Sequence, residues 1–129
     1  ELTNNKLYLK IEKVRFGNKL HAIFDVDESC LKARIPNMIL QPLYENAIKY
    51  GVYESTEPVQ VITKCRCKNN LLEVVISNSY DSRLKVKKGE GIGLRNIRDR
   101  LEIIYGNSLL LKIEDDKKKF TVTLAVPQN

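Results

Sequence analysis

Apolar and polar residues alternate with a period of two in five segments, and this alternation constrains the fold more than any other feature of the sequence. Successive side chains of a β-strand point to opposite faces of a sheet, so each segment has one face for a core. The segments are 19–27, 58–67, 71–78, 108–114 and 119–126. Lys68-Asn69-Asn70 joins the second segment to the third, which predicts a β-hairpin. Asp115-Asp116-Lys117 provides the turn before the last segment.

Asn78 is the polar exception on the apolar face of segment 71–78. Leu72, Val74 and Ile76 fix this face toward the core, so the fourth residue of the row is expected at the edge of the core, where a polar side chain needs a partner. It is either a turn residue that leaves the strand or a residue that contacts a ligand. In segment 108–114 the residues expected to share one face are Leu109, Leu111 and Ile113.

Helical periodicity of the apolar residues predicts three helices. The first covers 2–15, where the periodicity is imperfect, and the last covers 93–105. The residues expected on the buried face of the last helix are Leu94, Ile97, Leu101 and Ile104.

The remaining predicted helix, called the central helix, lies between these two in the chain and ends at Gly51. Its apolar face consists of Leu40, Leu43, Tyr44, Ala47 and Ile48. We expect this helix to begin at Pro36 or Asn37, with a local distortion at Pro42. The alternative is a short helix that has Pro42 at its first position.

Five strands and three helices, with a polar second face on several strands, predict helices layered on one side of the sheet. The expected fold is a two-layer α/β sandwich with a mixed, largely antiparallel sheet. A chain of 129 residues is long enough for one domain with its own core, so we expect a single domain over 1–129.

The composition is that of an ordinary globular domain, with 43% hydrophobic and 29% charged residues. No apolar run reaches the ~18 residues of a membrane span. The net charge of +6 is compatible with nucleic acid, an anionic membrane surface or an anionic small ligand as partner. Because acidic residues are interspersed among the basic ones, direct nucleic-acid binding is not expected. The three cysteines, Cys30, Cys65 and Cys67, do not have zinc-ligand spacing and are expected as free thiols.

Two polar motifs suggest binding chemistry. Asn46, Lys49 and Tyr50 are spaced i, i+3 and i+4, so an amide, an ammonium and a phenol share one stripe of the central helix. The second motif, Gly89-x-Gly91-x-Gly93, opens onto a helix, where backbone N–H groups and the helix dipole favour an anion. By itself the glycine pattern is weak, because a flexible loop has the same composition.

Taken together, the two motifs resemble those of a known family. Gln41-Pro42-Leu43-x-Glu45-Asn46-Ala47-Ile48-Lys49-x-Gly51 resembles the N box of LytS-like sensor histidine kinases. The segment from Gly91 to Leu101 resembles their G2 box, and 11–17 resembles the segment that leads into the same domain. The resemblance covers essentially the whole chain and implies the Bergerat fold, which gyrase, MutL and the heat-shock ninety chaperones share.

The resemblance also implies ATP and Mg²⁺ as cofactors. Asn46 matches the family's metal ligand, and together with its neighbour Glu45 it is the expected catalytic group. The expected nucleotide-binding residues are Asn46, Lys49, Tyr50, Asn78, Gly89, Gly91, Ile92, Gly93 and Leu94. Residues 79–92 resemble the ATP lid, whose cationic tip consists of Lys85, Lys87 and Lys88.

The chain departs from the wider superfamily at the G1 box, Asp-x-Gly-x-Gly, in which the Asp binds the adenine amino group. Asn78-Ser79-Tyr80-Asp81 stands at this place, so Asn78 takes the position of the Asp and both glycines are missing. The family's phosphoacceptor His lies upstream of the domain, and His21, the only histidine here, matches no such motif. Residues 1–16 are expected to lead in from an upstream helix of a longer protein.

The resemblance implies a protein-histidine kinase catalytic domain that transfers the γ-phosphoryl group of ATP to a His outside the chain. The implied partners are the upstream dimerisation and phosphoacceptor domain and a response regulator, of the LytTR type. The full-length protein is expected to be a membrane-tethered homodimer of the bacterial inner membrane, with this domain in the cytoplasm. The alternatives are a nucleotide-binding module without kinase activity, which Asn78 favours, an anti-sigma-type Ser/Thr kinase on the same fold, and an unrelated basic interaction domain.

Overall fold

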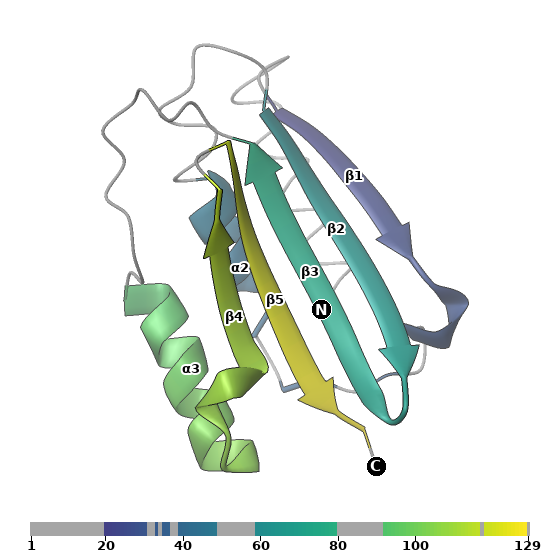
Figure 1. Cartoon of the computed structure of the whole chain (residues 1–129), viewed down its shortest axis with the longest axis vertical. Helices are drawn as coiled ribbons and strands as arrows, with labels where there is room; N and C mark the ends of the chain where they lie inside the picture. Colours follow the sequence, from purple (N-terminus) through teal and green to yellow (C-terminus); the bar gives the residue numbers. More distant parts are fainter. Residues whose placement is uncertain are drawn as a thin grey trace.

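The structure, a computed structural model, describes residues 20–30, 33, 35–36, 39–48, 59–79, 92–116 and 118–128. Its centre is a five-stranded sheet with the order β1-β2-β3-β5-β4 (Figure 1). The strands are β1 (Leu20–Val26), β2 (Val59–Lys68), β3 (Leu71–Ser79), β4 (Leu111–Asp115) and β5 (Lys119–Pro127). β1 runs parallel to β2, and the other neighbouring strands are antiparallel. The predicted mixed, mostly antiparallel sheet is confirmed.

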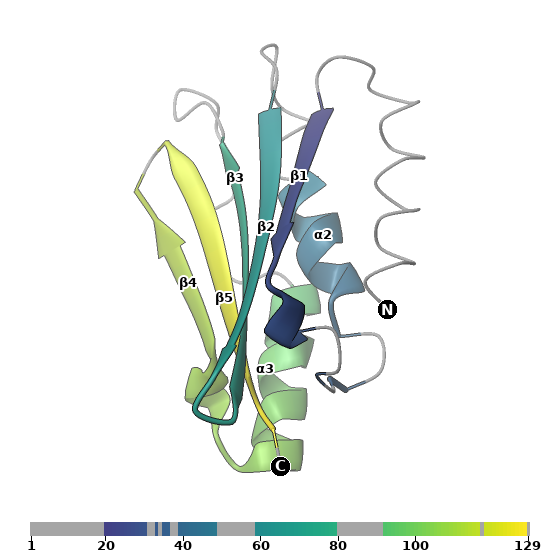
Figure 2. The ribbon, with the colours of Figure 1, turned by 90° about the vertical axis from the view of Figure 1, so that its right-hand side faces the viewer.

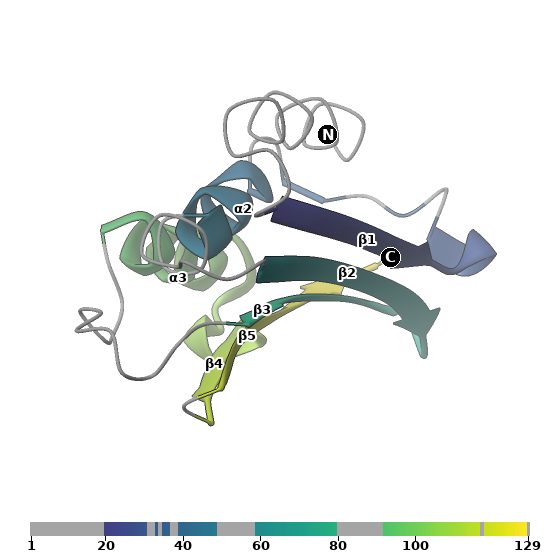
Figure 3. The same ribbon diagram turned by 90° about the horizontal axis from the view of Figure 1, so that it is seen from above.

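Two helices, α2 (Gln41–Ala47) and α3 (Ile92–Tyr105), lie on the same face of this sheet (Figures 2 and 3). Two short 3-10 turns accompany them, η2 (Glu28–Cys30) after β1 and η4 (Ser108–Leu110) before β4. The two-layer sandwich predicted from the sequence is therefore confirmed, whereas the helix expected over 2–15 lies outside the described residues. In the part of the chain that the structure describes, no helix is long and apolar enough to cross a membrane.

Two tight turns set the register of the antiparallel strands. Asn69 and Asn70 join β2 to β3 with φ angles of 55° and 60°, the left-handed conformation that asparagine tolerates and that a two-residue hairpin turn requires. Between β4 and β5, Asp116 Oδ1 accepts hydrogen bonds from the N–H groups of Lys118 and Lys119, at 2.9 and 2.7 Å. Side chains with local hydrogen-bonding capacity therefore form both turns where the sequence predicted them.

The hydrophobic core fills the space between the two helices and the inner face of the sheet. Alternate residues of each central strand are buried there, as their period of two requires. Among the buried residues are Leu43, Tyr44, Ala47 and Ile48 of α2, Leu94, Ile97 and Leu101 of α3, and Leu72, Val74 and Ile76 of β3. The apolar faces predicted for the central helix and for segment 71–78 are thus confirmed.

The start of α2 differs from the preferred prediction. The helix begins at Gln41 rather than at Pro36 or Asn37, with Leu40 as its N-cap and Pro42 as its second residue. Proline lacks an N–H group and would clash with a preceding turn of helix, but the first-turn N–H groups have no intrahelical partner to lose. The N–H groups of Leu43 and Tyr44 instead bond the Leu40 carbonyl. The short alternative therefore describes the helix better, although the position predicted for its C-terminal end, Gly51, lies outside the described residues.

Two further predictions of burial are wrong. Ile104 is 49% exposed, since it stands about 50° from the centre of the stripe formed by the buried leucine and isoleucine side chains of α3. Leu109 is 74% exposed and does not share the face of Leu111, because 108–110 form a 3-10 turn that breaks the strand alternation. Arg98 of α3 holds this turn, donating from Nη1 to the carbonyl oxygens of Ser108 and Leu111 at 3.0 and 2.9 Å.

The three cysteines are free thiols, as predicted. Cys65 is buried on β2, and burial, followed by the neighbouring Cys30 thiol, raises the pKa of Cys65 to about 11. A nearby ion pair, between Arg66 Nη2 and Asp25 Oδ2 at 2.9 Å, links β2 to β1 on the exposed side. The described residues contain no cluster of three or more His, Cys, Asp or Glu side chains that could hold a metal ion, and this includes the surroundings of the cysteines.

Candidate functional site

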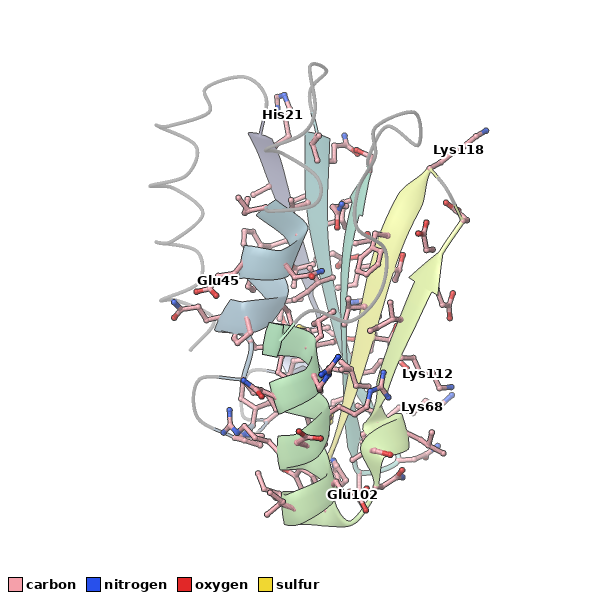
Figure 4. The ribbon with its side chains drawn as sticks, turned by 90° about the vertical axis from the view of Figure 1, so that its left-hand side faces the viewer. His21, Glu45, Lys68, Glu102, Lys112 and Lys118 are labelled. Carbon is pink, nitrogen blue, oxygen red and sulfur yellow. The ribbon has the colours of Figure 1, made fainter. Side chains whose placement is uncertain are left out.

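The two motifs singled out in the sequence meet where α2 and α3 pack together. A Cβ atom placed on Gly93, at the start of α3, would lie 3.7 Å from Pro42 Cβ, at the start of α2. The two residues are 51 positions apart in the chain, and no local pattern joins them. The tertiary structure therefore brings the N-terminal turn of α3 against the first turn of the central helix (Figures 2 and 4).

Asn46 follows Pro42 by four residues, so both project from the same side of α2. The Asn46 side chain is 9% exposed, and its Nδ2 atom is buried with no hydrogen-bond partner in the part of the chain that the structure describes. A buried amide without a partner costs free energy, so its persistence at this place calls for a ligand or another polar group. The carboxamide can turn by 180° about its last bond and present its oxygen to the same partner.

Glu45, the second predicted catalytic residue, lies on the exposed side of α2 and points away from the sheet (Figure 4). Its Oε1 atom accepts a hydrogen bond of 3.0 Å from Gln41 Nε2, one turn earlier. Adjacent helical residues are about 100° apart around the axis, which separates the exposed carboxylate from the buried Asn46 amide. A direct role of Glu45 at a metal or a water stays a prediction.

Asn78 ends the inner face of β3 and is 2% exposed. It pairs with Val61 of β2 on one side and with Phe120 of β5 on the other. Its Nδ2 atom donates to the Ser79 carbonyl oxygen at 3.3 Å. No hydrogen bond to its Oδ1 atom is seen among the described residues, so the carboxamide offers an acceptor at the C-terminal edge of β3. This is the core-edge position that the strand pattern predicted.

Tyr44 fastens α2 to the sheet beneath this region. Its hydroxyl group and that of Thr63 on β2 are 2.7 Å apart, and both side chains are fully buried. Burial, opposed in part by this hydrogen bond, raises the pKa of Tyr44 well above its usual value. The pair was missed in the sequence, although Thr63 is a hydroxyl residue on a strand face shared with Val61 and Cys65, which is a signal for a buried polar contact.

The structure covers only part of the predicted site. Lys49, Tyr50, Gly89 and Gly91 lie outside the described residues, as do Lys85, Lys87 and Lys88 of the predicted lid. Ile92 opens α3, and Gly93 is exposed beside it. Leu94 is buried in the core, so only its backbone can contact a ligand. Among the described residues, α2, which carries Asn46, packs against the start of α3 and against β3, and Asn78 lies near the C-terminal end of β3.

This arrangement offers amide groups and helix N–H groups rather than a cluster of acids. The N-terminus of a 14-residue helix attracts an anion, and an amide oxygen is a ligand that Mg²⁺ accepts alongside phosphate oxygens and waters. The unpaired Asn46 amide and the start of α3 therefore fit a metal-bound phosphate group. The Asn78 acceptor suits a donor such as an exocyclic amino group.

No protein-family model matches the chain. Among curated proteins, it is 30% identical over 125 residues to the sensor histidine kinase YesM of Bacillus subtilis, covering 93% of this chain and 22% of that protein. It is 30% identical over 141 residues to the sensor protein LytS of Oceanobacillus iheyensis, covering 98% of this chain and 24% of that protein. The chain thus spans less than a quarter of the length of these two relatives.

Among solved structures, the fold is similar to the catalytic domain of histidine kinase ThkA, with a TM-score of 0.68 and 17% identity. The match covers 96% of this chain and 90% of that one. Five strands with α2 and α3 on one face are therefore the fold of a histidine kinase catalytic domain, as the resemblance implied. Over nearly its full length the chain is thus a homologue of LytS and other sensor histidine kinases, and it has the fold of a histidine kinase catalytic domain.

Proposed function

We propose that the chain is the ATP-binding catalytic domain of a LytS-like sensor histidine kinase and transfers the γ-phosphoryl group of ATP to a His outside residues 1–129. The observation that carries the proposal is the buried Asn46 amide, unpaired within the described residues, on the side of α2 that faces the start of α3. A polar group kept in such a place is better explained by a ligand than by the stability of the fold.

In this proposal Asn46 holds Mg²⁺ through its amide oxygen. Bound Mg²⁺ neutralises charge on the phosphates and so favours phosphoryl transfer. The backbone N–H groups of Ile92, Gly93 and Leu94 bind phosphate oxygens at the start of α3, because the helix dipole and the unpaired N–H groups of its first turn favour an anion. Gly93 leaves room there for close approach of a phosphate.

In the same proposal, further residues contact the adenine base and the phosphates of ATP. Asn78 accepts a hydrogen bond from the adenine amino group through Oδ1, because its own N–H group is already bonded to Ser79. Lys49 neutralises phosphate charge, and Tyr50 packs against the nucleotide. Gly89 and Gly91 extend the phosphate-binding backbone, and the lysine-rich lid covers the phosphates.

The proposal for the rest of the protein is based on the relatives, of whose length this chain covers 22% and 24%. We propose an upstream dimerisation domain that carries the phosphoacceptor His and a response regulator of the LytTR type that receives the phosphoryl group. A membrane-tethered homodimer in the bacterial inner membrane, with this domain on the cytoplasmic side, is consistent with sensor kinases as relatives.

Nucleotide affinity in Mg²⁺ and in EDTA tests the central assignment. Asn46→Ala should weaken binding of ATP in Mg²⁺ by at least about tenfold, which is ~1.4 kcal/mol, and should change binding in EDTA much less. Gln60→Ala, which removes an exposed carboxamide between the buried Val59 and Val61, is the matched control and should bind as the wild type does. Equal losses for Asn46→Ala in both conditions would remove this residue from the metal site.

Radiolabelled ATP tests the reaction. The 129-residue chain should bind ATP without labelling His21, because transfer needs an acceptor placed in line with the γ-phosphate. The full-length protein should acquire an acid-labile label on a His upstream of this domain. A full-length protein that binds ATP and acquires no such label would instead be a nucleotide-binding module without kinase activity.

A further inference from the structure

A buried hydrogen bond joins Tyr44 of α2 to Thr63 of β2, in the middle of the sheet. The Tyr44 and Thr63 hydroxyl groups are 2.7 Å apart, and neither side chain reaches solvent. Thr63 is flanked by Phe24 of β1 and Ile76 of β3, and the ring of Phe24 lies 6.4 Å from that of Tyr44, between centroids. Both partners therefore belong to well-packed surroundings that restrict their movement.

Apart from Asn46, the other buried side chains of α2 in the described part of the chain are apolar, and their contacts have little directional character. The helix has seven residues, about two turns, and no side chain caps its N-terminus. Its other buried contacts with the core come from Leu43, Ala47 and Ile48, and apolar contacts resist separation more than sliding or rotation. A short hydrogen bond depends on both distance and angle, so it resists such movements.

Tyr44 and Asn46 are two positions apart, which places them about 200° apart around the helix axis. A rotation of α2 that moves one along the sheet moves the other in nearly the opposite direction. Nδ2 of Asn46 has no partner among the described residues that could correct this displacement. The direction in which the Asn46 amide points thus depends on the contact that Tyr44 makes with the sheet on the opposite side of α2.

We propose that the Tyr44–Thr63 hydrogen bond is a positioning device that aims the Asn46 amide at Mg²⁺. The inference rests on the function proposed above for Asn46. It adds that two hydroxyl groups on the far side of the helix control the Mg²⁺-dependent part of nucleotide binding without touching the nucleotide or the metal.

Two substitutions of Thr63 separate positioning from packing. The measured quantity is the ratio of the affinities for the β,γ-imido analogue of ATP in Mg²⁺ and in EDTA, obtained by calorimetry on the 129-residue chain. Thr63→Val keeps the volume and loses the hydroxyl, and should lower this ratio by about three- to tenfold, somewhat less than the 10–100-fold typical of losing a direct partner of a metal ligand. Thr63→Ser keeps the hydroxyl and should retain the wild-type ratio, even though it loses a buried methyl group.

Tyr44→Phe removes the other hydroxyl and should lower the ratio as Thr63→Val does. The double variant should be no worse than either single one, because both changes break the same bond. Val126→Ala is the control for lost stability, because Val126 is buried near the end of β5 that lies away from Asn78. This variant should melt at a lower temperature than the wild type and keep the wild-type ratio of affinities. Thermal melting confirms that each variant is folded.

The outcomes that overturn the inference differ from those that overturn the proposed function. A wild-type ratio in Tyr44→Phe and Thr63→Val, while Asn46→Ala loses it, would reduce the Tyr44–Thr63 bond to packing. The same holds if Thr63→Ser lowers the ratio as much as Thr63→Val does. A wild-type chain without any Mg²⁺-dependent affinity would overturn the metal role of Asn46 and, with it, the inference.

Discussion

Replacement of Asn78 by Asp tests the proposal that the edge of β3 recognises a base. Asn78 is buried, and its Nδ2 atom donates to the Ser79 carbonyl oxygen at 3.3 Å, which leaves Oδ1 as the acceptor for a ligand. Asp has nearly the same shape and introduces the carboxylate that the G1 box has in the superfamily that the sequence resembles. The substitution therefore changes the charge and the donor while it conserves the packing.

Two opposing effects set the magnitude. In the nucleotide complex, a charged acceptor contributes about 1.5–3 kcal/mol, against about 0.5–1.5 for a neutral one, and the difference of ~1 kcal/mol is about fivefold in affinity for ATP. Without nucleotide, a carboxylate oxygen replaces Nδ2 at the position 3.3 Å from the Ser79 carbonyl oxygen. Loss of this donor in a buried position should cost about 1–3 kcal/mol of folding stability.

Calorimetric titration and thermal melting with ATP and GTP measure both effects. We expect Asn78→Asp to melt at a lower temperature than the wild type without nucleotide, to bind ATP more tightly and to discriminate more strongly against GTP, whose 6-oxo group would face the carboxylate. Asn78→Ala, the control without an acceptor, should lose the preference for ATP. Unchanged ATP binding by Asn78→Ala would refute the reasoning and make Asn78 a turn residue only.

Two other predictions concern the start of α3 and the buried thiol. Gly93→Ala should keep or raise the melting temperature, because its Cβ meets Pro42 only at an ordinary contact distance and alanine suits a helix better by about 0.5–1 kcal/mol. The same variant should bind ATP about 10–100-fold more weakly, as expected when a backbone-to-phosphate bond of ~1.5–3 kcal/mol is lost, and wild-type affinity by calorimetry would contradict phosphate binding there. Burial raises the pKa of Cys65 from 9.0 to about 11, so the unfolded chain loses this proton first and stability should fall as pH rises through this range. The free energy of unfolding, measured with urea between pH 8 and pH 11 in steps of ~1 pH unit, should fall less steeply with pH for Cys65→Ala than for the wild type.

Most of the fold could be predicted because it depends on local periodicity. A period of two identified all five strands within three residues at each end, and side chains able to close tight turns marked both antiparallel connections. The errors arose where a local pattern continued past its physical limit. The alternation expected over 108–114 includes Leu109, but 108–110 form a 3-10 turn. The helix expected from Pro36 or Asn37 does not continue through Pro42, whose ring is compatible only with a first turn.

The candidate site was predicted residue by residue, and its assembly was not. The spacing around Asn46 and the row that ends at Asn78 identified two polar groups on otherwise buried elements. Nothing in the spacing could place Pro42 against Gly93, since contacts between distant segments depend on how whole helices pack.

By itself, the sequence determined the period of each element, the polar residues at the ends of apolar faces and the two motifs that resemble a kinase domain. Only the tertiary structure decided where α2 begins, which residue of α3 meets it and which hydroxyl on β2 bonds Tyr44. The physical reason is that side-chain periodicity reports only which face of an element is buried. Contact between two buried faces depends on how distant elements pack, and Tyr44 and Thr63, for example, are 19 residues apart in the chain.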